Sequence, residues 1–102
     1  MSPQPSPNHE LTLRDAIRIP DHVVYRAFPA ETVVLNLNTA KYHGLNPTGG
    51  RMLEAAERAG SLEEAAKRLA EEYGQPTDEI ERDLLKFCDE LISRDLLELR
   101  SP

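Results

Sequence analysis

The stretch TVVLNLNTAKYHGLN, residues 32–46, decides the fold of this chain. Its first part is rich in β-branched and apolar side chains, which strands prefer, and KYHGL resumes as a second strand after the turn NTA. A helical pattern begins at Asn46-Pro47, so nothing obvious remains in the sequence to cover the outer edge of that second strand. An open strand edge invites pairing with another chain, and native proteins usually protect it.

The residues before this stretch predict a further strand. HVVYRAF, residues 22–28, is joined to residues 32–37 by the turn PAE, which makes an antiparallel meander with KYHGL at its edge. Because alternate side chains share a face, Val33, Leu35 and Leu37 are expected on a dry face and the intervening positions on a partly wet one.

Only short elements are predicted near the two ends of the chain. Residues 1–10 are polar and hold three prolines, which predicts a disordered tail before a single domain over residues 11–102. LTLRDAIRI, residues 11–19, alternates only partly and predicts a short first strand. LLEL, residues 96–99, predicts a short extended piece that closes the domain.

Two helices are predicted directly after the strands. The first begins at Asn46-Pro47, since Asn caps free N–H groups and Pro suits the first helical position, and it ends at Gly60. The second begins at Ser61, which has a glutamate three residues later as in a capping box, and it ends at Gly74.

A third helix is predicted over about residues 78–94, with Thr77 as its cap. One apolar stripe follows helical spacing at Ile80, Leu84, Phe87 and Leu91. A second stripe lies beside it at Leu85, Cys88 and Ile92. The order predicts an α+β fold of the winged helix-turn-helix type, in which a three-stranded antiparallel sheet is followed by three helices.

Composition limits the class of protein. The 102 residues suit one domain, and no apolar run approaches the roughly 20 residues of a membrane helix. The start MSPQPSPNHE lacks the basic and apolar regions of a signal peptide. One cysteine cannot form an internal disulfide, which fits a reducing compartment. Together with the missing membrane helix and signal peptide, this predicts a cytoplasmic location without membrane partners.

The charge is distributed unevenly. Residues 1–60 hold 6 acidic and 6 basic side chains, whereas residues 61–102 hold 12 acidic and 6 basic, which accounts for the net charge of −6. A winged-helix DNA-binding regulator is the alternative that the fold suggests, but its reading helix would carry seven acidic side chains against three basic ones. Such a helix repels a duplex, so no nucleic-acid partner is expected.

Catalytic and metal chemistry find no support in the sequence. His9, His22 and His43 lie far apart and lack metal-ligand spacing with Cys88. NPTGGR lacks the Lys-Ser/Thr of a P-loop, and no nucleophile has a plausible base. We therefore expect no enzyme activity, no metal and no cofactor.

The order of these elements resembles a known family. VVLNLNTAKYHGLN, the helix after NP, SLEEAAKRLAEEY and the third helix ending in LISRDLLEL are similar to PqqD-like domains, over about residues 23–99. These domains recognise the leader peptides of ribosomally made, modified peptides. As a short separate chain, this one looks most like the small leader-binding protein of lasso peptide biosynthesis.

The resemblance implies a mechanism and a site. A precursor's leader, commonly with a Tyr-x-x-Pro motif, would add as a strand to the third strand of the meander and lie against the third helix. The bound precursor would pass to a separate leader peptidase and then to a cyclase. The docking strand would consist of Lys41, Tyr42, His43, Gly44 and Leu45. Apolar pockets would come from Leu85, Cys88 and Ile92, or from Leu84 and Phe87 if the helix is rotated, and Glu81 and Asp89 would meet basic leader residues.

A third interpretation uses the same open edge differently. A scaffold or assembly domain would pair its own strand edges between copies, without any peptide ligand. The sequence leaves this alternative open beside the leader-binding module and the DNA-binding regulator.

Overall fold

The computed structural model describes residues 10–100. The tail predicted for residues 1–10 lies outside this range, except for Glu10. The elements follow in the order β1 (Ile17–Arg18), β2 (Val23–Ala27), β3 (Thr32–Asn36), β4 (Lys41–Leu45), α1 (Pro47–Arg58), α2 (Leu62–Tyr73), α3 (Thr77–Ser93) and β5 (Glu98–Leu99).

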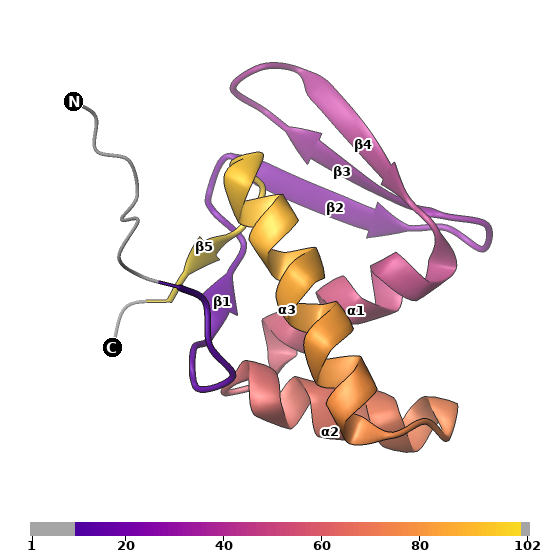
Figure 1. The fold of residues 1–102 in the computed structure, drawn as a ribbon. Helices are drawn as coiled ribbons and strands as arrows, with labels where there is room; N and C mark the ends of the chain where they lie inside the picture. Colours follow the sequence, from indigo (N-terminus) through magenta and orange to yellow (C-terminus); the bar gives the residue numbers. More distant parts are fainter. Residues whose placement is uncertain (1–9, 101–102) are drawn as a thin grey trace.

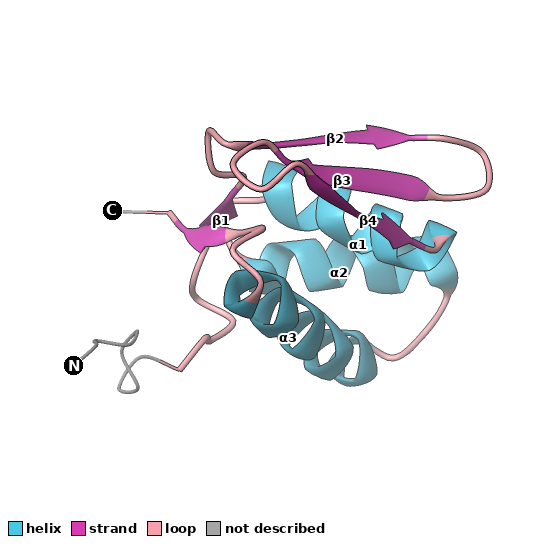
Figure 2. Cartoon of the chain, turned by 90° about the horizontal axis from the view of Figure 1, so that it is seen from above, coloured by secondary structure: helices cyan, strands magenta, loops and turns pink. Residues whose placement is uncertain are grey.

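The predicted α+β fold is confirmed. Strands β2, β3 and β4 form an antiparallel sheet in that order, and the three helices follow it in the chain (Figure 1). All three helices lie on one side of this sheet, so its other face is left without a covering layer from residues 10–100 (Figure 2). No helix in the described part of the chain is long and apolar enough to cross a membrane.

A second, two-stranded sheet joins the ends of the described chain. The strand predicted within residues 11–19 shortens to Ile17–Arg18, and it pairs antiparallel with Glu98–Leu99. The residues before it reach α2, since Leu62 N–H donates to Asp15 O at 2.9 Å. This pairing holds the two ends of the fold together.

The buried face of β3 is the opposite of the predicted one. Thr32, Val34 and Asn36 face the helices and are 4%, 1% and 5% exposed. The predicted dry face is the outer one, on which Leu37 is 55% exposed. The polar side chain of Asn36 can lie on the inner face because it is hydrogen-bonded there, accepting from Asn38 N–H at 2.9 Å.

Most of the predicted helix ends are confirmed. The Asn46 side chain accepts from Gly49 N–H at 2.7 Å, and the Ser61 side chain accepts from Glu64 N–H at 3.2 Å. Gly74 ends α2 in the left-handed conformation, with φ of 65°. The predicted cap of α3 is wrong: Thr77 is its first helical residue, Pro76 is the capping position, and no side chain bonds there.

Candidate functional site

The hydrogen bonds between the strands show which backbone N–H and C=O groups of β4 are free to pair. Phe28 N–H donates to Glu31 O at 2.8 Å and Leu37 N–H donates to His22 O at 2.7 Å. Because backbone groups in an antiparallel ladder alternate in direction, the odd-numbered residues of β3 therefore face β2 and the even-numbered ones face β4.

The register then assigns each residue of β4. Lys41, His43 and Leu45 lie opposite the even-numbered residues of β3, so their backbone groups point into the sheet. Tyr42 and Gly44 alternate with them, so their N–H and C=O groups point away from β3. No strand in residues 10–100 pairs with that side of β4. The open edge expected from the sequence is present, with two residues ready to pair.

A groove runs beside this edge. Its volume is about 460 Å³, and it lies between the end of β4, the start of α1 and one side of α3. Its lining residues are Gly44, Leu45, Asn46, Thr48, Gly49, Met52, Asp83, Phe87 and Glu90. Of the five predicted docking-strand residues, Gly44 and Leu45 line the groove directly, and the other three continue the same strand.

The rotation of α3 corrects the predicted pockets. Leu84 and Cys88 are both 0% exposed and belong to the core, so they do not line an open groove. Phe87 is half-buried and points into the groove. The sequence left open an alternative in which Leu84 and Phe87 form the pockets. The structure agrees with this alternative for Phe87 but not for Leu84.

The other predicted helix residues lie on a different side of α3. Each helical residue turns by about 100°, so Ile92 lies about 140° around the axis from Phe87, and Leu85 lies about 160° from it. Glu81 and Asp89 are similarly displaced. The lining of the groove includes none of these four residues. The position of Phe87 beside the groove could have been predicted if the buried side of α3 had been known, which consists of Ile80, Leu84, Cys88 and Leu91. The sequence, however, shows two plausible apolar stripes.

The groove is acidic on its helical side. Among the described residues, Asp83 and Glu90 are the only charged ones that line it. They differ by about 20° around α3 and flank Phe87 along the axis. Neither carboxylate has an ion-pair partner among residues 10–100.

A smaller pocket continues the groove. It holds about 140 Å³ between α1, the end of α2 and the start of α3, and it shares Thr48, Met52 and Asp83 with the groove. Its remaining lining residues are Leu69, Tyr73, Gln75 and Ile80. A dry cavity of about 150 Å³ accepts a benzene ring, so an aromatic side chain matches this pocket in size.

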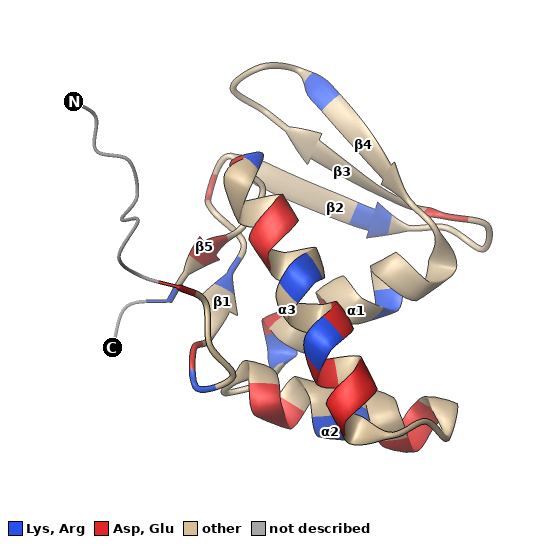
Figure 3. Cartoon of the chain, viewed as in Figure 1, with Lys and Arg blue, Asp and Glu red and all other residues tan. Residues whose placement is uncertain are grey.

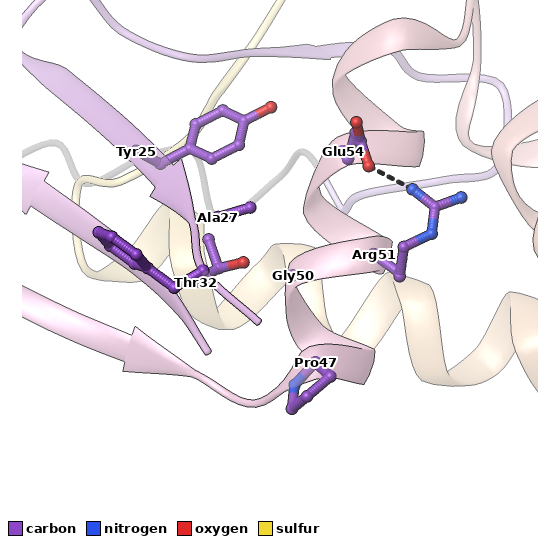
Figure 4. Close-up of a pocket in the computed structure, with 8 residues that line it drawn as sticks. Tyr25, Ala27, Thr32, Pro47, Gly50, Arg51 and Glu54 are labelled. Atoms are coloured by element: carbon purple, nitrogen blue, oxygen red, sulfur yellow. Dashed lines mark hydrogen bonds and ion pairs between the residues drawn. The ribbon is translucent and has the colours of Figure 1, made fainter. Parts of the chain in front are cut away.

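A third hollow, at the opposite edge of the sheet, is occupied by its own polar pairs. It lies between β2 and α1, and Arg51 there bonds to Glu54 (Figure 4) and also to Glu72. The hydrogen bond to Arg51 lowers the pKa of Glu72. Burial and the hydrogen bond to Glu57 raise the pKa of Tyr25. These ion pairs leave no unpaired charge among the described residues that line the hollow.

No group of three metal-ligating side chains occurs among the described residues. Burial raises the pKa of the Cys88 thiol to about 12, as expected of an inert thiol in an apolar core.

Comparison with known proteins places this geometry in a family. Residues 31–97 match the family model described as coenzyme PQQ synthesis protein D, PqqD. The solved complex of TbiB1 with the TbiA(beta) leader peptide is similar over 83% of this chain and 99% of that chain, with 33% identity and a TM-score of 0.73. None of the curated proteins compared matches the chain.

Proposed function

We propose that this chain, which belongs to the PqqD family, binds the leader region of a ribosomally made precursor peptide. The observation that carries the proposal is the open edge of β4, where Tyr42 and Gly44 turn their backbone groups outward beside a groove. The TbiB1 chain, whose similarity spans both proteins, was solved with a leader peptide bound.

The leader adds to the sheet as a strand beside β4. Its backbone pairs with Tyr42 and Gly44, and every second side chain turns toward α3. Backbone pairing gives affinity to any extended peptide, whereas side-chain pockets give selectivity. Phe87 is the apolar contact of the groove on α3, in place of Leu85, Cys88 and Ile92.

The smaller pocket suits the Tyr-x-x-Pro motif that the family resemblance implies. An aromatic ring that enters between Met52, Leu69 and Ile80 would be anchored beyond the end of β4. Buried aromatic anchors commonly dominate the energy of an interface. The proline would then lie between this anchor and the paired strand.

The protein presents the peptide and does not process it. Catalysis comes from a separate leader peptidase, followed by a cyclase that produces a lasso peptide. The uncovered outer face of the sheet is a suitable surface for the peptidase, because Val24, Leu35 and Tyr42 lie side by side across its three strands. Val24 is 47% exposed and Tyr42 is 72% exposed, and a bound leader would extend this apolar row by one strand.

Amide hydrogen exchange tests the strand addition. A synthetic leader peptide that carries the Tyr-x-x-Pro motif is added, and residue-resolved exchange is compared with that of the free protein. Tyr42 and Gly44 should become protected on binding, while His43 is protected in both states. If the leader binds and these two amides exchange as before, strand addition at β4 is wrong.

Size-exclusion chromatography separates the alternatives. The leader should co-elute with the protein, whereas duplex DNA should not, since α3 is acidic (Figure 3). Co-elution with DNA would favour a regulator. A dimer that the leader does not dissociate would favour a scaffold that pairs its own edges.

The peptidase surface has its own test. Val24→Glu and Leu37→Glu should slow leader cleavage by the peptidase while leaving leader affinity unchanged. Phe28→Glu is the matched control, because Phe28 is 51% exposed at the far end of the sheet. Equal cleavage by all three variants would exclude the outer face as the docking surface.

A further inference from the structure

The groove beside β4 is asymmetric in charge. The two carboxylates of Asp83 and Glu90 line its helical side, and β4 contributes only Gly44 and Leu45 to the lining. Most of the ion pairs in the described chain join an arginine to a carboxylate, for example Arg51 to Glu72 and Arg68 to Glu64. Among residues 10–100, Asp83 and Glu90 have no ion-pair partner, although Lys86 lies within one turn of both.

The spacing of the two carboxylates matches an extended peptide. Asp83 and Glu90 are seven positions apart on the helix, which is about 10 Å along the axis, and Phe87 lies between them. Side chains of an added strand that face α3 recur about every 7 Å. Three successive α3-facing side chains therefore span the three positions, with the middle one over Phe87 and flexible outer ones within reach of the carboxylates.

We propose that Asp83 and Glu90 select leaders that carry a basic, an apolar and a basic side chain at alternate positions of the paired strand. This inference rests on the proposed function, because it assumes that the leader lies in this groove. The pattern is the same in either direction of the chain, so it holds for a parallel or an antiparallel added strand. The selected ligand is thus a cationic, extended peptide segment with an apolar centre.

The surface charge of the protein as a whole does not explain such selectivity. Acidic residues are spread over α2 and α3 (Figure 3), and any of them attracts a cation weakly. Asp83 and Glu90 line the groove, whereas Glu81 and Asp89 of the same helix do not. This difference supplies a control in which the net charge changes by the same amount.

The test measures leader affinity for four charge reversals. Asp83→Lys and Glu90→Lys should each weaken binding by about three- to tenfold at low salt, as expected when an exposed attraction becomes a repulsion. Glu81→Lys and Asp89→Lys should change it by less than about twofold. The probe is a fluorescently labelled leader peptide that carries the Tyr-x-x-Pro motif and the basic, apolar, basic pattern, and thermal melts verify that each variant is folded.

A charge swap completes the test. A copy of that leader with glutamates in place of its basic residues in the paired strand should bind Asp83→Lys/Glu90→Lys better than it binds the unaltered protein. Equal effects of groove and off-groove reversals, or no recovery in the swap, would overturn the inference. In that case a loss of binding in Tyr42→Pro would still support the proposed function, whereas a leader that fails to bind the unaltered protein would overturn both.

Discussion

Gly50 of α1 lies directly against Thr32 of β3. A Cβ atom at position 50 would meet Thr32 Oγ1 at 2.2 Å and its Cβ at 3.0 Å, well inside any ordinary contact distance. Helix α1 can approach the sheet this closely because residue 50 has no side chain. This approach fixes the start of α1, whose first turns form one end of the groove beside β4.

Gly50→Ala should therefore destabilise the fold, although alanine favours helices by about 1 kcal/mol over glycine. Overpacking commonly costs about 1–3 kcal/mol, so we expect a net loss of about 1–2 kcal/mol in the free energy of unfolding. Chemical denaturation measures it. Thr32→Ala should restore most of the loss in the double variant. Gly49→Ala, whose nearest contact would be 3.3 Å, is the milder control.

Proline substitutions in β4 should separate stability from binding. Tyr42→Pro removes an outward N–H, so the fold should survive while leader affinity falls by about tenfold or more. His43→Pro removes a donor to β3 and should lower the free energy of unfolding by about 1–3 kcal/mol. Thermal melts and leader titrations on both variants check the alternation. Normal leader binding by folded Tyr42→Pro would mean that the peptide docks elsewhere.

Phe87 and Ile92 offer a direct comparison between two sides of α3. Both are half-buried against the core, so Phe87→Ala and Ile92→Ala should each destabilise the protein. Phe87→Ala should also weaken leader binding by more than about tenfold, as truncated aromatic anchors do, and Ile92→Ala should not. Calorimetric titration decides it. A larger binding loss in Ile92→Ala would restore the stripe suggested by the sequence.

Cys88 should be chemically silent in the native protein. Its side chain is 0% exposed and burial raises the pKa of its thiol to about 12, so little thiolate is available at pH 8. A thiol reagent should modify the protein only when denaturant is added. Rapid modification of the folded protein would show that this face of α3 opens, contrary to its place in the core.

Leader binding should depend on salt only weakly. Two exposed carboxylates contribute modestly and are screened, whereas the contacts with Phe87 and the smaller pocket are apolar. Between 0.05 and 0.5 M NaCl the affinity should fall by no more than about tenfold. Titrations at several salt concentrations measure the slope. A collapse of binding at moderate salt would mean that charge dominates over the apolar contacts.

The candidate site was predictable up to the orientation of its helix. KYHGL predicts an edge strand. Its place in the meander needs no tertiary information, because strands joined by hairpins follow one another in the chain. The facing helix was different. Its apolar residues form a band that is wide enough for two stripes, and only the packing of Leu84 and Cys88 into the core turns Phe87 toward the groove. Asp83 and Glu90 could not be singled out among seven acidic residues.

The sequence by itself determined the order of the elements and most of their ends, because Asn46, Ser61 and Gly74 act through local hydrogen bonds and backbone preferences. The tertiary structure decided which faces are buried. It turned Thr32 and Asn36 inward and left Leu37 exposed, against their polarity. The physical reason is that the rotation of an element depends on all of its partners at once: α1 approaches the sheet closely at Gly50, and Thr32 is the residue that it meets there.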